Sequence, residues 1–347
     1  MISYQVAAFG KPLARAEKAP PAPKGGEVLV KITASGVCHS DVHLWEGGFD
    51  LGGGRRLPAP LPEALPLTLG HEILGEVAAV GPDAKGVKVG DKRLVFPWIG
   101  CGSCGVCAKG DEHLCLKPQA LGVNRDGGYA SHVLVPHARY LLAYDGLDPD
   151  LAATYACSGL TAFSALKKVG KLGAGDSLLI IGAGGVGLAG VRFAKAVTGL
   201  APIVADRDPA KEAAARAAGA SEFVRVDEAA AKTIAKLTGG VAAAIDFVGA
   251  EESARLGDRS LRKGGKLVIV GLFGGSLTLP LPLVPIRAVT IQGSYVGSLA
   301  ELTELLALAK KGVSQPMPIT QRPLDQAGQS LADLRDGRIT GRVVLKP

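Results

Sequence analysis

The sequence predicts a two-domain α/β protein, in which a domain of short β-strands accompanies a doubly wound parallel sheet. The 347 residues exceed what one ordinary hydrophobic core accommodates. Short alternating strands and turns dominate the chain up to residue 153, whereas buried strands alternate with helices from Ser177 onward. We therefore assign 1–153 and 290–347 to the β-rich domain, because the tail is too short to stand alone, and 154–289 to the parallel sheet.

The composition excludes several classes of protein. With 47% hydrophobic residues, 20% charged residues and 48 glycines, the chain is typical of a folded α/β protein rather than a disordered one. It has no apolar run of the ~18 residues that a membrane span needs and no recognisable secretion signal. The net charge of +7 comes from scattered Lys and Arg without a basic block. We expect a cytoplasmic protein that binds neither a membrane nor a nucleic acid.

The first domain begins with short strands separated by turns. Glu27–Ile32 alternates like a half-buried strand, and Glu76–Val80 is a second strand that Gly81-Pro82-Asp83 ends. Between them, 47–66 is rich in Gly and Pro and is expected to be a structureless loop, which is usually functional or mobile. Short strands joined by turns predict a small barrel-like β domain.

A cluster of four cysteines predicts a metal site in a glycine-rich loop. Cys101, Cys104, Cys107 and Cys115 follow the spacing C-x2-C-x2-C-x7-C, and four thiolates close a tetrahedral structural zinc site. An iron–sulfur cluster is the rival, since the first three spacings fit a ferredoxin. Its fourth cysteine would follow after three residues and precede proline, whereas Cys115 follows after seven and precedes Leu116. The spacing therefore favours structural zinc.

The second domain opens on a strand–turn–helix that predicts dinucleotide binding. The apolar run Ser177–Ile181 leads into Gly182-Ala183-Gly184-Gly185-Val186-Gly187, which starts a helix reaching about Val197. We expect Gly182 to make the turn, Gly184 to admit the pyrophosphate and Gly187 to pack the helix on the strand. The N-terminal end of the helix then stabilises the phosphates together with Gly185 and Val186.

An acidic residue at the end of the next strand indicates which cofactor is preferred. Asp206 follows the last glycine of the turn by nineteen residues, where it would accept hydrogen bonds from the ribose and repel a 2′-phosphate. Arg207 beside it would suit NADP, but the acid carries more weight and favours NAD. The remaining predicted elements are strands 203–206, 222–226, 241–247, 266–272 and 339–345, and helices 209–218, 228–238, 251–262 and 301–311.

The stretch Gly36–His43 holds the densest set of reactive side chains: Cys38, His39, Ser40, Asp41 and His43. A free cysteine is usually only a small buried hydrophobe, so this stretch alone is ambiguous. Two further segments carry matching residue types, Gly70-His71-Glu72 and Cys157-Ser158-Gly159-x-Thr161.

Together with the cysteine cluster, the Gly182–Gly187 turn and Gly341-Arg342, these segments resemble the zinc-containing medium-chain alcohol dehydrogenases over essentially the whole chain. The order and the intervals are similar to the NAD-dependent tetrameric branch in archaea and bacteria. The resemblance implies a GroES-like catalytic domain made from both chain ends, with a Rossmann domain between them. It also implies NAD and two zinc ions per subunit, and a homotetramer, with a dimer as the alternative.

The resemblance places the catalytic zinc on Cys38, His71 and Cys157, with Glu72 counted at the metal and Asp41 accepting from the far nitrogen of His71. Two thiolates, one imidazole and an open fourth position are a known catalytic set for zinc. In isolation, His71 would more often be a core histidine.

The zinc would then polarise an alcohol or carbonyl oxygen as a Lewis acid. Ser40 would take the alcohol proton and pass it through the nicotinamide ribose to His43, whose ordinary pKa lies near neutrality.

The same resemblance assigns cofactor and substrate contacts. Thr161 and Val186 would touch the nicotinamide end, His39 and Arg342 the pyrophosphate, and Lys211 the adenosine ribose; Lys211 and Arg342 could equally be surface charges. The residues that would line an apolar cleft for a hydrocarbon or aromatic alcohol are Phe49, Trp98 and Val123, although Trp98 could also be ordinary core.

Two alternatives remain open at this stage. A polyol or threonine dehydrogenase of the same superfamily would need a more polar cleft than Trp98 and Phe49 suggest. A zinc-ribbon module that binds nucleic acid would account for four cysteines and the positive charge. It would leave Cys38, His71, Cys157 and the dinucleotide turn without a role. The predicted small-molecule partners are an alcohol and the corresponding aldehyde or ketone.

Overall fold

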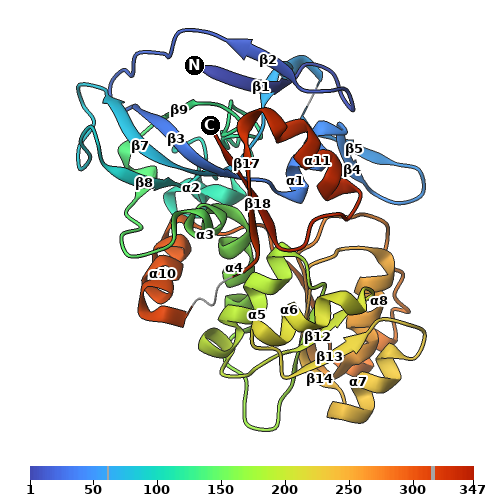
Figure 1. Cartoon of the computed structure of the whole chain (residues 1–347). Coiled ribbons are helices and arrows are strands. Elements are labelled where there is room, and N and C mark those ends of the chain that lie inside the picture. Colours follow the sequence, from blue (N-terminus) through green and yellow to red (C-terminus); the bar gives the residue numbers. More distant parts are fainter. Residues whose placement is uncertain (61, 314–316) are drawn as a thin grey trace.

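The computed structural model describes all residues except 61 and 314–316, and it divides into two halves (Figure 1). The upper half in this view combines the blue N-terminal strands with the red C-terminal strands β17 (Ile319–Pro323) and β18 (Arg342–Lys346). The lower half contains the yellow-green, yellow and orange part of the chain. Both termini therefore lie in the same half.

A seven-stranded sheet forms the centre of the first half. Its strands are β3 (Val28–Gly36), β7 (Glu72–Val80), β8 (Lys92–Val95), β9 (His132–Val135), β10 (Leu141–Leu142), β17 (Ile319–Pro323) and β18 (Arg342–Lys346). The strand order is β10-β8-β7-β3-β18-β17, with β9 pairing with β3. In β18, Val344 and Leu345 lie opposite Gly36 and Ser35, so the end of the chain adjoins the stretch that precedes Cys38.

Smaller strand groups flank this sheet. A three-stranded sheet has the order β2-β1-β6, formed by β1 (Ile2–Val6), β2 (Ala14–Glu17) and β6 (Leu67–Thr68). The expectation that 47–66 lacks structure is wrong, because β4 (Gly48–Asp50) and β5 (Arg56–Pro58) pair as an antiparallel hairpin. Residue 61 of this segment lies outside the described residues. The glycines 52–54 have φ between +61° and +76° and make the turn of the hairpin, a use of glycine that the composition alone does not distinguish from a loop.

The second half is built on a six-stranded parallel sheet with the order β13-β12-β11-β14-β15-β16. Its strands are β11 (Leu178–Ile181), β12 (Ile203–Asp206), β13 (Glu222–Arg225), β14 (Val241–Asp246), β15 (Leu261–Ile269) and β16 (Thr290–Gly293). Strands β11, β12 and β14 are buried along their whole length, as expected when helices cover both faces. Strand β16 follows residue 289, the predicted end of the parallel-sheet domain. Its backbone pairs with β15 in that sheet.

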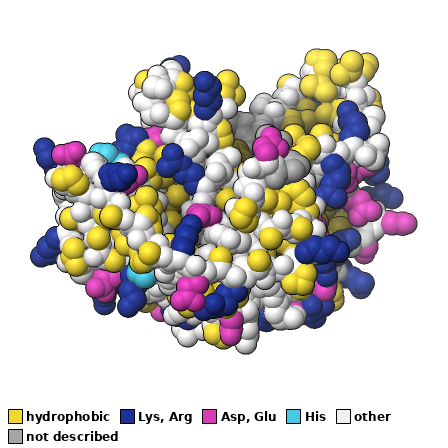
Figure 2. All heavy atoms as spheres, turned by 90° about the horizontal axis from the view of Figure 1, so that it is seen from above, with side chains coloured by type: hydrophobic (Ala, Val, Ile, Leu, Met, Phe, Trp, Pro, Cys, Tyr) yellow, Lys and Arg dark blue, Asp and Glu magenta, His cyan; other side chains and the backbone are white. Residues whose placement is uncertain are grey.

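Eleven α-helices are present among the described residues: α1 (His39–Trp45), α2 (Gly105–Ala108), α3 (Pro149–Thr154), α4 (Leu160–Val169), α5 (Gly185–Thr198), α6 (Glu212–Ala217), α7 (Ala230–Thr238), α8 (Glu251–Ser260), α9 (Leu283–Arg287), α10 (Leu299–Leu308) and α11 (Ala327–Arg335). A π-helical turn, Tyr155–Gly159, joins α3 to α4 at the junction of the two halves. None of the described helices is long and apolar enough to cross a membrane. On the face shown in Figure 2, basic side chains are interspersed with acidic and apolar ones rather than gathered in a stripe.

Candidate functional site

Three potential metal ligands from distant parts of the chain meet in the interior. The ligand atoms of Cys38, His71 and Cys157 lie within 4.8 Å of one another, and all three residues are buried. Cys38 precedes α1, His71 precedes β7, and Cys157 lies in the π-helical turn. The two sulfurs are 3.9 Å apart. Two zinc-bound sulfurs in a tetrahedral site, each about 2.3 Å from the ion, would lie about 3.8 Å apart, so the geometry fits this metal.

The imidazole of His71 supports the same conclusion. Both of its ring nitrogens are buried, and neither makes a hydrogen bond to a described residue. Nδ1 lies 3.0 Å from Oδ1 of Asp41, an ion-pair distance without hydrogen-bond alignment. A buried imidazole nitrogen without a partner is costly unless it binds something. The donor set of two sulfurs and one nitrogen, which leaves one coordination position free, is that of a catalytic zinc.

The two thiols of this group differ in acidity. A hydrogen bond from Cys157 lowers the pKa of Cys38 well below its usual value, against the opposing effect of burial. The same interaction raises the pKa of Cys157, and burial adds to that rise. A metal that binds this pair requires both sulfurs as thiolates.

Glu72, which the prediction counted with the residues of the catalytic metal, is held by two other groups. Its Oε1 accepts a hydrogen bond from the Ser158 backbone N–H at 3.1 Å, and its Oε2 is paired with Arg342. Burial raises the pKa of Glu72 to about 7, and the Arg342 charge opposes that rise. Both oxygens of Glu72 therefore have partners, and Glu72 is not one of the three grouped ligands.

Asp41 connects the Cys38 segment to the His71 segment. Its Oδ2 accepts from the Cys38 backbone N–H at 3.0 Å and from the Tyr129 hydroxyl at 2.9 Å. Its Oδ1 accepts from the Gly70 backbone N–H at 3.3 Å and faces Nδ1 of His71. The sequence reasoning missed Tyr129, because nothing in its local pattern indicates that it meets a residue 88 positions away.

The predicted relay residues lie beside the metal group. The hydroxyl oxygen of Ser40 is 3.9 Å from Sγ of Cys38. The ring of His43 lies 5.1 Å from that of Phe49, which places this predicted cleft residue next to the relay. Phe273 is a second missed residue, since its ring lies 4.6 Å from His39 and 6.2 Å from His43. Burial lowers the pKa of His43.

A cavity of about 330 Å³ runs along the carboxyl ends of the parallel strands, where α/β folds bind ligands. It is lined by every predicted cofactor contact except Thr161, namely His39, Gly182, Gly184, Gly185, Val186, Gly187, Asp206, Arg207, Lys211 and Arg342. Thr161 lies in α4 with its hydroxyl buried and without a hydrogen-bond partner among the described residues.

The Gly182–Gly187 turn has the geometry that lets the following helix pack closely on it and a ligand approach its backbone. Gly182 has φ of +95°, which favours glycine, and a Cβ on Gly187 would lie 1.8 Å from the carbonyl oxygen of Gly182. A Cβ on Gly184 would meet no atom within 4 Å, so the backbone there borders open space.

Asp206 is held in a defined orientation at the far end of this cavity. Its carboxylate accepts from the backbone N–H groups of Ala183 at 2.7 Å and Asp208 at 2.9 Å. Lys211 Nζ lies 3.1 Å from both of its oxygens, so Lys211 is not a free surface charge.

Trp98, one of the predicted cleft residues, packs directly over the metal group. Its ring lies 5.2 Å from that of His71, its indole N–H donates to the Ala156 carbonyl at 2.9 Å, and it is 4% exposed. Tyr295, a third missed residue, meets the other side of Trp98 edge-on at 6.0 Å. Val123 is half-buried and packs against the core.

The four clustered cysteines form a second potential metal group. Their ligand atoms lie within 4.8 Å of one another, and the shorter sulfur–sulfur distances are 3.5, 3.8 and 3.9 Å. These values fit the ~3.8 Å of a tetrahedral zinc–sulfur site. Glu112 secures the loop, because its carboxylate accepts from the Gly100 N–H at 3.2 Å and from the Tyr140 hydroxyl at 2.6 Å.

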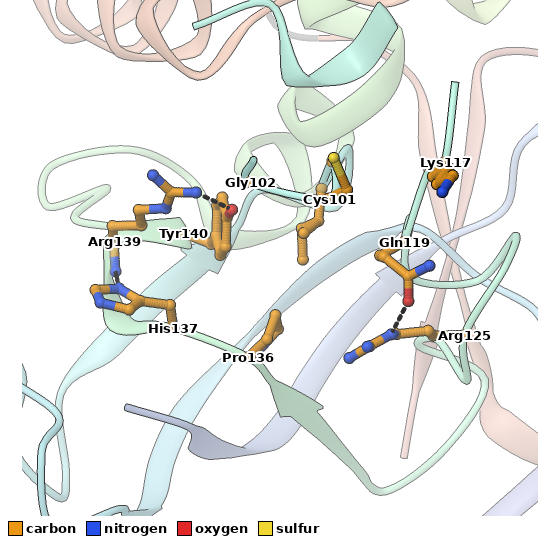
Figure 3. Close-up of a pocket in the computed structure, with 11 residues that line it drawn as sticks. Cys101, Gly102, Lys117, Gln119, Arg125, Pro136, His137, Arg139 and Tyr140 are labelled. Carbon is orange, nitrogen blue, oxygen red and sulfur yellow. Dashed lines mark hydrogen bonds between the residues drawn. The ribbon is translucent and has the colours of Figure 1, made fainter. Parts of the chain in front are cut away.

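Figure 3 shows an open concavity of about 570 Å³ beside this loop. Arg125, which Gln119 orients at 2.8 Å, lies on one side of Pro136, and His137 and Arg139 lie on the other. None of the predicted catalytic or cofactor residues lines this concavity. It belongs to the surroundings of the cysteine loop rather than to the catalytic group.

Comparisons with known proteins identify the family. A profile described as "Alcohol dehydrogenase GroES-like domain" matches residues 24–145, and one described as "Zinc-binding dehydrogenase" matches 185–311. The chain is 39% identical to a "NAD-dependent alcohol dehydrogenase" of Saccharolobus solfataricus over 100% of both chains, and equally identical, with the same coverage, to one of Sulfurisphaera tokodaii. A solved alcohol dehydrogenase of Aeropyrum pernix superposes with a TM-score of 0.89 at 31% identity over 100% of both chains.

The chain belongs to the zinc-binding alcohol dehydrogenase family. The fold class that the sequence predicts, a GroES-like domain with a Rossmann domain, is confirmed by these matches.

Proposed function

We propose that this protein catalyses reversible hydride transfer between NAD and a primary or secondary alcohol with an apolar or aromatic body. Its class is that of an NAD-dependent zinc alcohol dehydrogenase, in which alcohol and NAD⁺ give an aldehyde or ketone, NADH and a proton. The observation that carries the proposal is that the three-residue metal group adjoins the dinucleotide cavity. His39, next to Cys38, lines the dinucleotide cavity, and Arg342 touches both Glu72 and that cavity.

In this proposal, Cys38, His71 and Cys157 hold the catalytic zinc, and Cys101, Cys104, Cys107 and Cys115 hold the structural one. The catalytic ion, when bound, supplies Lewis-acid polarisation of the alcohol or carbonyl oxygen. The Ser40 hydroxyl accepts the alcohol proton, and His43 releases it to solvent. The depressed pKa of His43 keeps its imidazole neutral and able to accept a proton at pH 7.

Asp206 selects NAD in this proposal. Its carboxylate is 8% exposed, and two backbone N–H groups fix its position, so it cannot turn away from a 2′-phosphate. Arg207 also borders the cavity, but it lies on its exposed rim. This carboxylate can accept hydrogen bonds from the ribose hydroxyls, whereas a 2′-phosphate would bring only acceptor oxygens to it.

Two aromatic groups restrict the substrate to apolar molecules. Trp98 presents its ring to His71 and uses its only polar atom on Ala156, while Tyr295 covers its edge. Phe49 adds a third ring near His43. Such a mainly aromatic lining offers few hydrogen-bond partners for the extra polar groups of a polyol or an amino acid.

Initial rates with ethanol, 1-butanol, cyclohexanol, benzyl alcohol, glycerol, sorbitol and threonine test this proposal. We expect kcat/KM for benzyl alcohol to exceed that for glycerol at least 100-fold, and NAD to exceed NADP. Chelation should abolish turnover, and zinc should restore it. Comparable rates with sorbitol or threonine would replace this substrate class with the polyol or threonine alternative.

We also propose a homotetramer, with a dimer as the alternative, in the cytoplasm. The edge strand β16 leaves one side unpaired in the described sheet, and Leu281, Leu283, Ile286 and Ile291 nearby are exposed. None of the six cysteines is paired in a disulfide, which suits a reducing compartment. Light scattering of the eluting protein measures the mass, and Ile286→Lys should reduce it. A monomeric wild type would exclude the assembly.

A further inference from the structure

We propose that Tyr129 is a positioning residue for the catalytic metal, acting through Asp41 and Gly70 on both Cys38 and His71. This inference rests on the proposed function, because it requires zinc at the three-residue group. In the part of the chain that the structure describes, Tyr129 makes no hydrogen bond to any of the three ligands. Its effect would therefore be on how firmly the site holds its metal rather than on the reacting atoms.

The hydroxyl of Tyr129 completes the hydrogen bonding of a buried carboxylate. Tyr129 and Asp41 are both 0% exposed, so no solvent molecule at the surface can replace the 2.9 Å hydrogen bond between them. Oδ2 of Asp41 receives this bond together with the one from the Cys38 N–H. Without the hydroxyl, Oδ2 would keep a single donor.

The other oxygen of the same carboxylate acts on His71. Oδ1 receives the Gly70 N–H at 3.3 Å and lies 3.0 Å from Nδ1 of His71. One buried carboxylate thus holds the backbone at Cys38 and lies at ion-pair distance from the ring of His71. A metal-bound histidine is oriented by the acceptor on its far nitrogen, and the acceptor is in turn held by its own hydrogen bonds. Tyr129 is the only side chain among the described residues that the structure shows donating a hydrogen bond to Asp41.

The ring and backbone of Tyr129 act on the His71 segment directly. The Tyr129 N–H donates to the Leu69 carbonyl at 2.9 Å. Gly70 has φ of +91°, and a Cβ there would lie 2.5 Å from Cδ1 of Tyr129. The tyrosine ring therefore packs closely against the residue before His71, while its hydroxyl reaches past it to Asp41. The ring contact and the backbone hydrogen bond together fix the position of the backbone that leads into His71.

Tyr129→Phe isolates the hydroxyl, because phenylalanine keeps the ring contact with Gly70 and the backbone bond to Leu69. Two matched variants serve as controls. Tyr140→Phe removes a hydroxyl that bonds Glu112 beside the cysteine loop. Tyr144→Phe removes a hydroxyl from a tyrosine that is 7% exposed and has no hydrogen bond to either metal-associated carboxylate.

The experiment measures zinc release from the holoenzyme to the chromogenic chelator 4-(2-pyridylazo)resorcinol. Phases are assigned with Cys157→Ala, which lacks the catalytic ion. We expect Tyr129→Phe to speed release from the catalytic site about tenfold and to leave the structural phase unchanged, as changes around a metal ligand typically do. Tyr140→Phe should affect only the structural phase, and Tyr144→Phe neither. Replacing the catalytic zinc with cobalt should show a shifted visible absorption band in Tyr129→Phe alone, and the NADH affinity should stay the same.

Release rates and a cobalt spectrum identical to those of the wild type would overturn the inference. Equal acceleration in Tyr129→Phe and Tyr144→Phe would also overturn it, since a general loss of stability would then explain the effect. Failure of the proposed function looks different. In that case wild-type protein would lack zinc at Cys38, His71 and Cys157, whereas failure of this inference leaves two zinc ions per wild-type chain.

Discussion

Two glycines of the same turn should respond differently to alanine, because the structure gives their Cβ positions different surroundings. A Cβ on Gly187 would lie 1.8 Å from the carbonyl oxygen of Gly182 and 2.9 Å from its carbonyl carbon. A Cβ on Gly184 would meet nothing within 4 Å, and its φ of −81° suits alanine. Gly187→Ala should therefore damage the fold, while Gly184→Ala should damage cofactor binding alone.

The magnitudes follow from these distances. An ordinary carbon–oxygen contact is about 3.3 Å, so Gly187→Ala is short of it by about 1.5 Å. Both sides of the clash are backbone, within a helix and its preceding turn, so neither moves freely. We expect a loss of about 3 kcal/mol, the upper end for overpacking, and a Tm lower by about 6–12 °C. Gly184→Ala should change stability by less than about 1 kcal/mol.

For cofactor binding, we expect the larger effect in Gly184→Ala. The open space at Gly184 borders the cavity in which we place the pyrophosphate, so a methyl group there occupies ligand space. NADH fluorescence titration should show at least tenfold weaker binding for Gly184→Ala, and thermal unfolding without cofactor should show nearly unchanged stability. An unchanged NADH affinity in Gly184→Ala would remove the turn from the cofactor site. A wild-type Tm in Gly187→Ala would contradict the close packing of α5.

Three further predictions concern charge, metal and pH. Asp206→Asn should lower the ratio of kcat/KM for NAD over NADP at least tenfold, and an unchanged ratio would contradict its role as selector. Cys104→Ser should leave one zinc per chain by elemental analysis and lower the Tm, because the loop has no core of its own; two zinc ions would refute the four-cysteine site. The pKa of His43 lies below its ordinary 6.5, so only the unfolded chain gains a proton as the pH falls through 6.5. His43→Gln should therefore lose less free energy of unfolding than the wild type between pH 8 and 5.5 in denaturant titrations, whereas an equal loss would contradict the burial argument.

The features that could be predicted from sequence are those whose residues are close along the chain. The cysteine loop spans only 101–115, so its spacing already defines a tetrahedral sulfur site. The Gly182–Gly187 turn and Asp206 likewise belong to one strand–helix–strand unit, whose geometry is the same in many proteins. The catalytic group has no such spacing, since Cys38 and Cys157 are 119 residues apart. Only the resemblance to a family brought them together.

The features that sequence reasoning missed depend on contacts between distant segments or on turn geometry. The partner of Glu72 was not predicted, because Arg342, which pairs with its carboxylate, lies 270 residues further on. Nothing near Tyr295 in the sequence indicates that its ring would meet Trp98. In 47–66, composition suggested a loop, while glycines with positive φ allow a hairpin that brings Phe49 to His43. The domain limits and the roles of the individual site residues remain predictions.

The two metal groups differ in what holds their ligands before any ion binds, and this difference explains their distinct dependence on the fold. The cysteine loop relies on Glu112 and a few N–H···S contacts at its edge, so the ion itself supplies much of the free energy that orders it. The proposed catalytic ligands adjoin a helix or a strand, and Asp41 links the backbone of Cys38 to that of Gly70, the residue before His71, through buried hydrogen bonds. A site arranged in this way keeps its geometry while substrate enters and leaves the fourth position, because its ligands are fixed by the protein rather than by the metal.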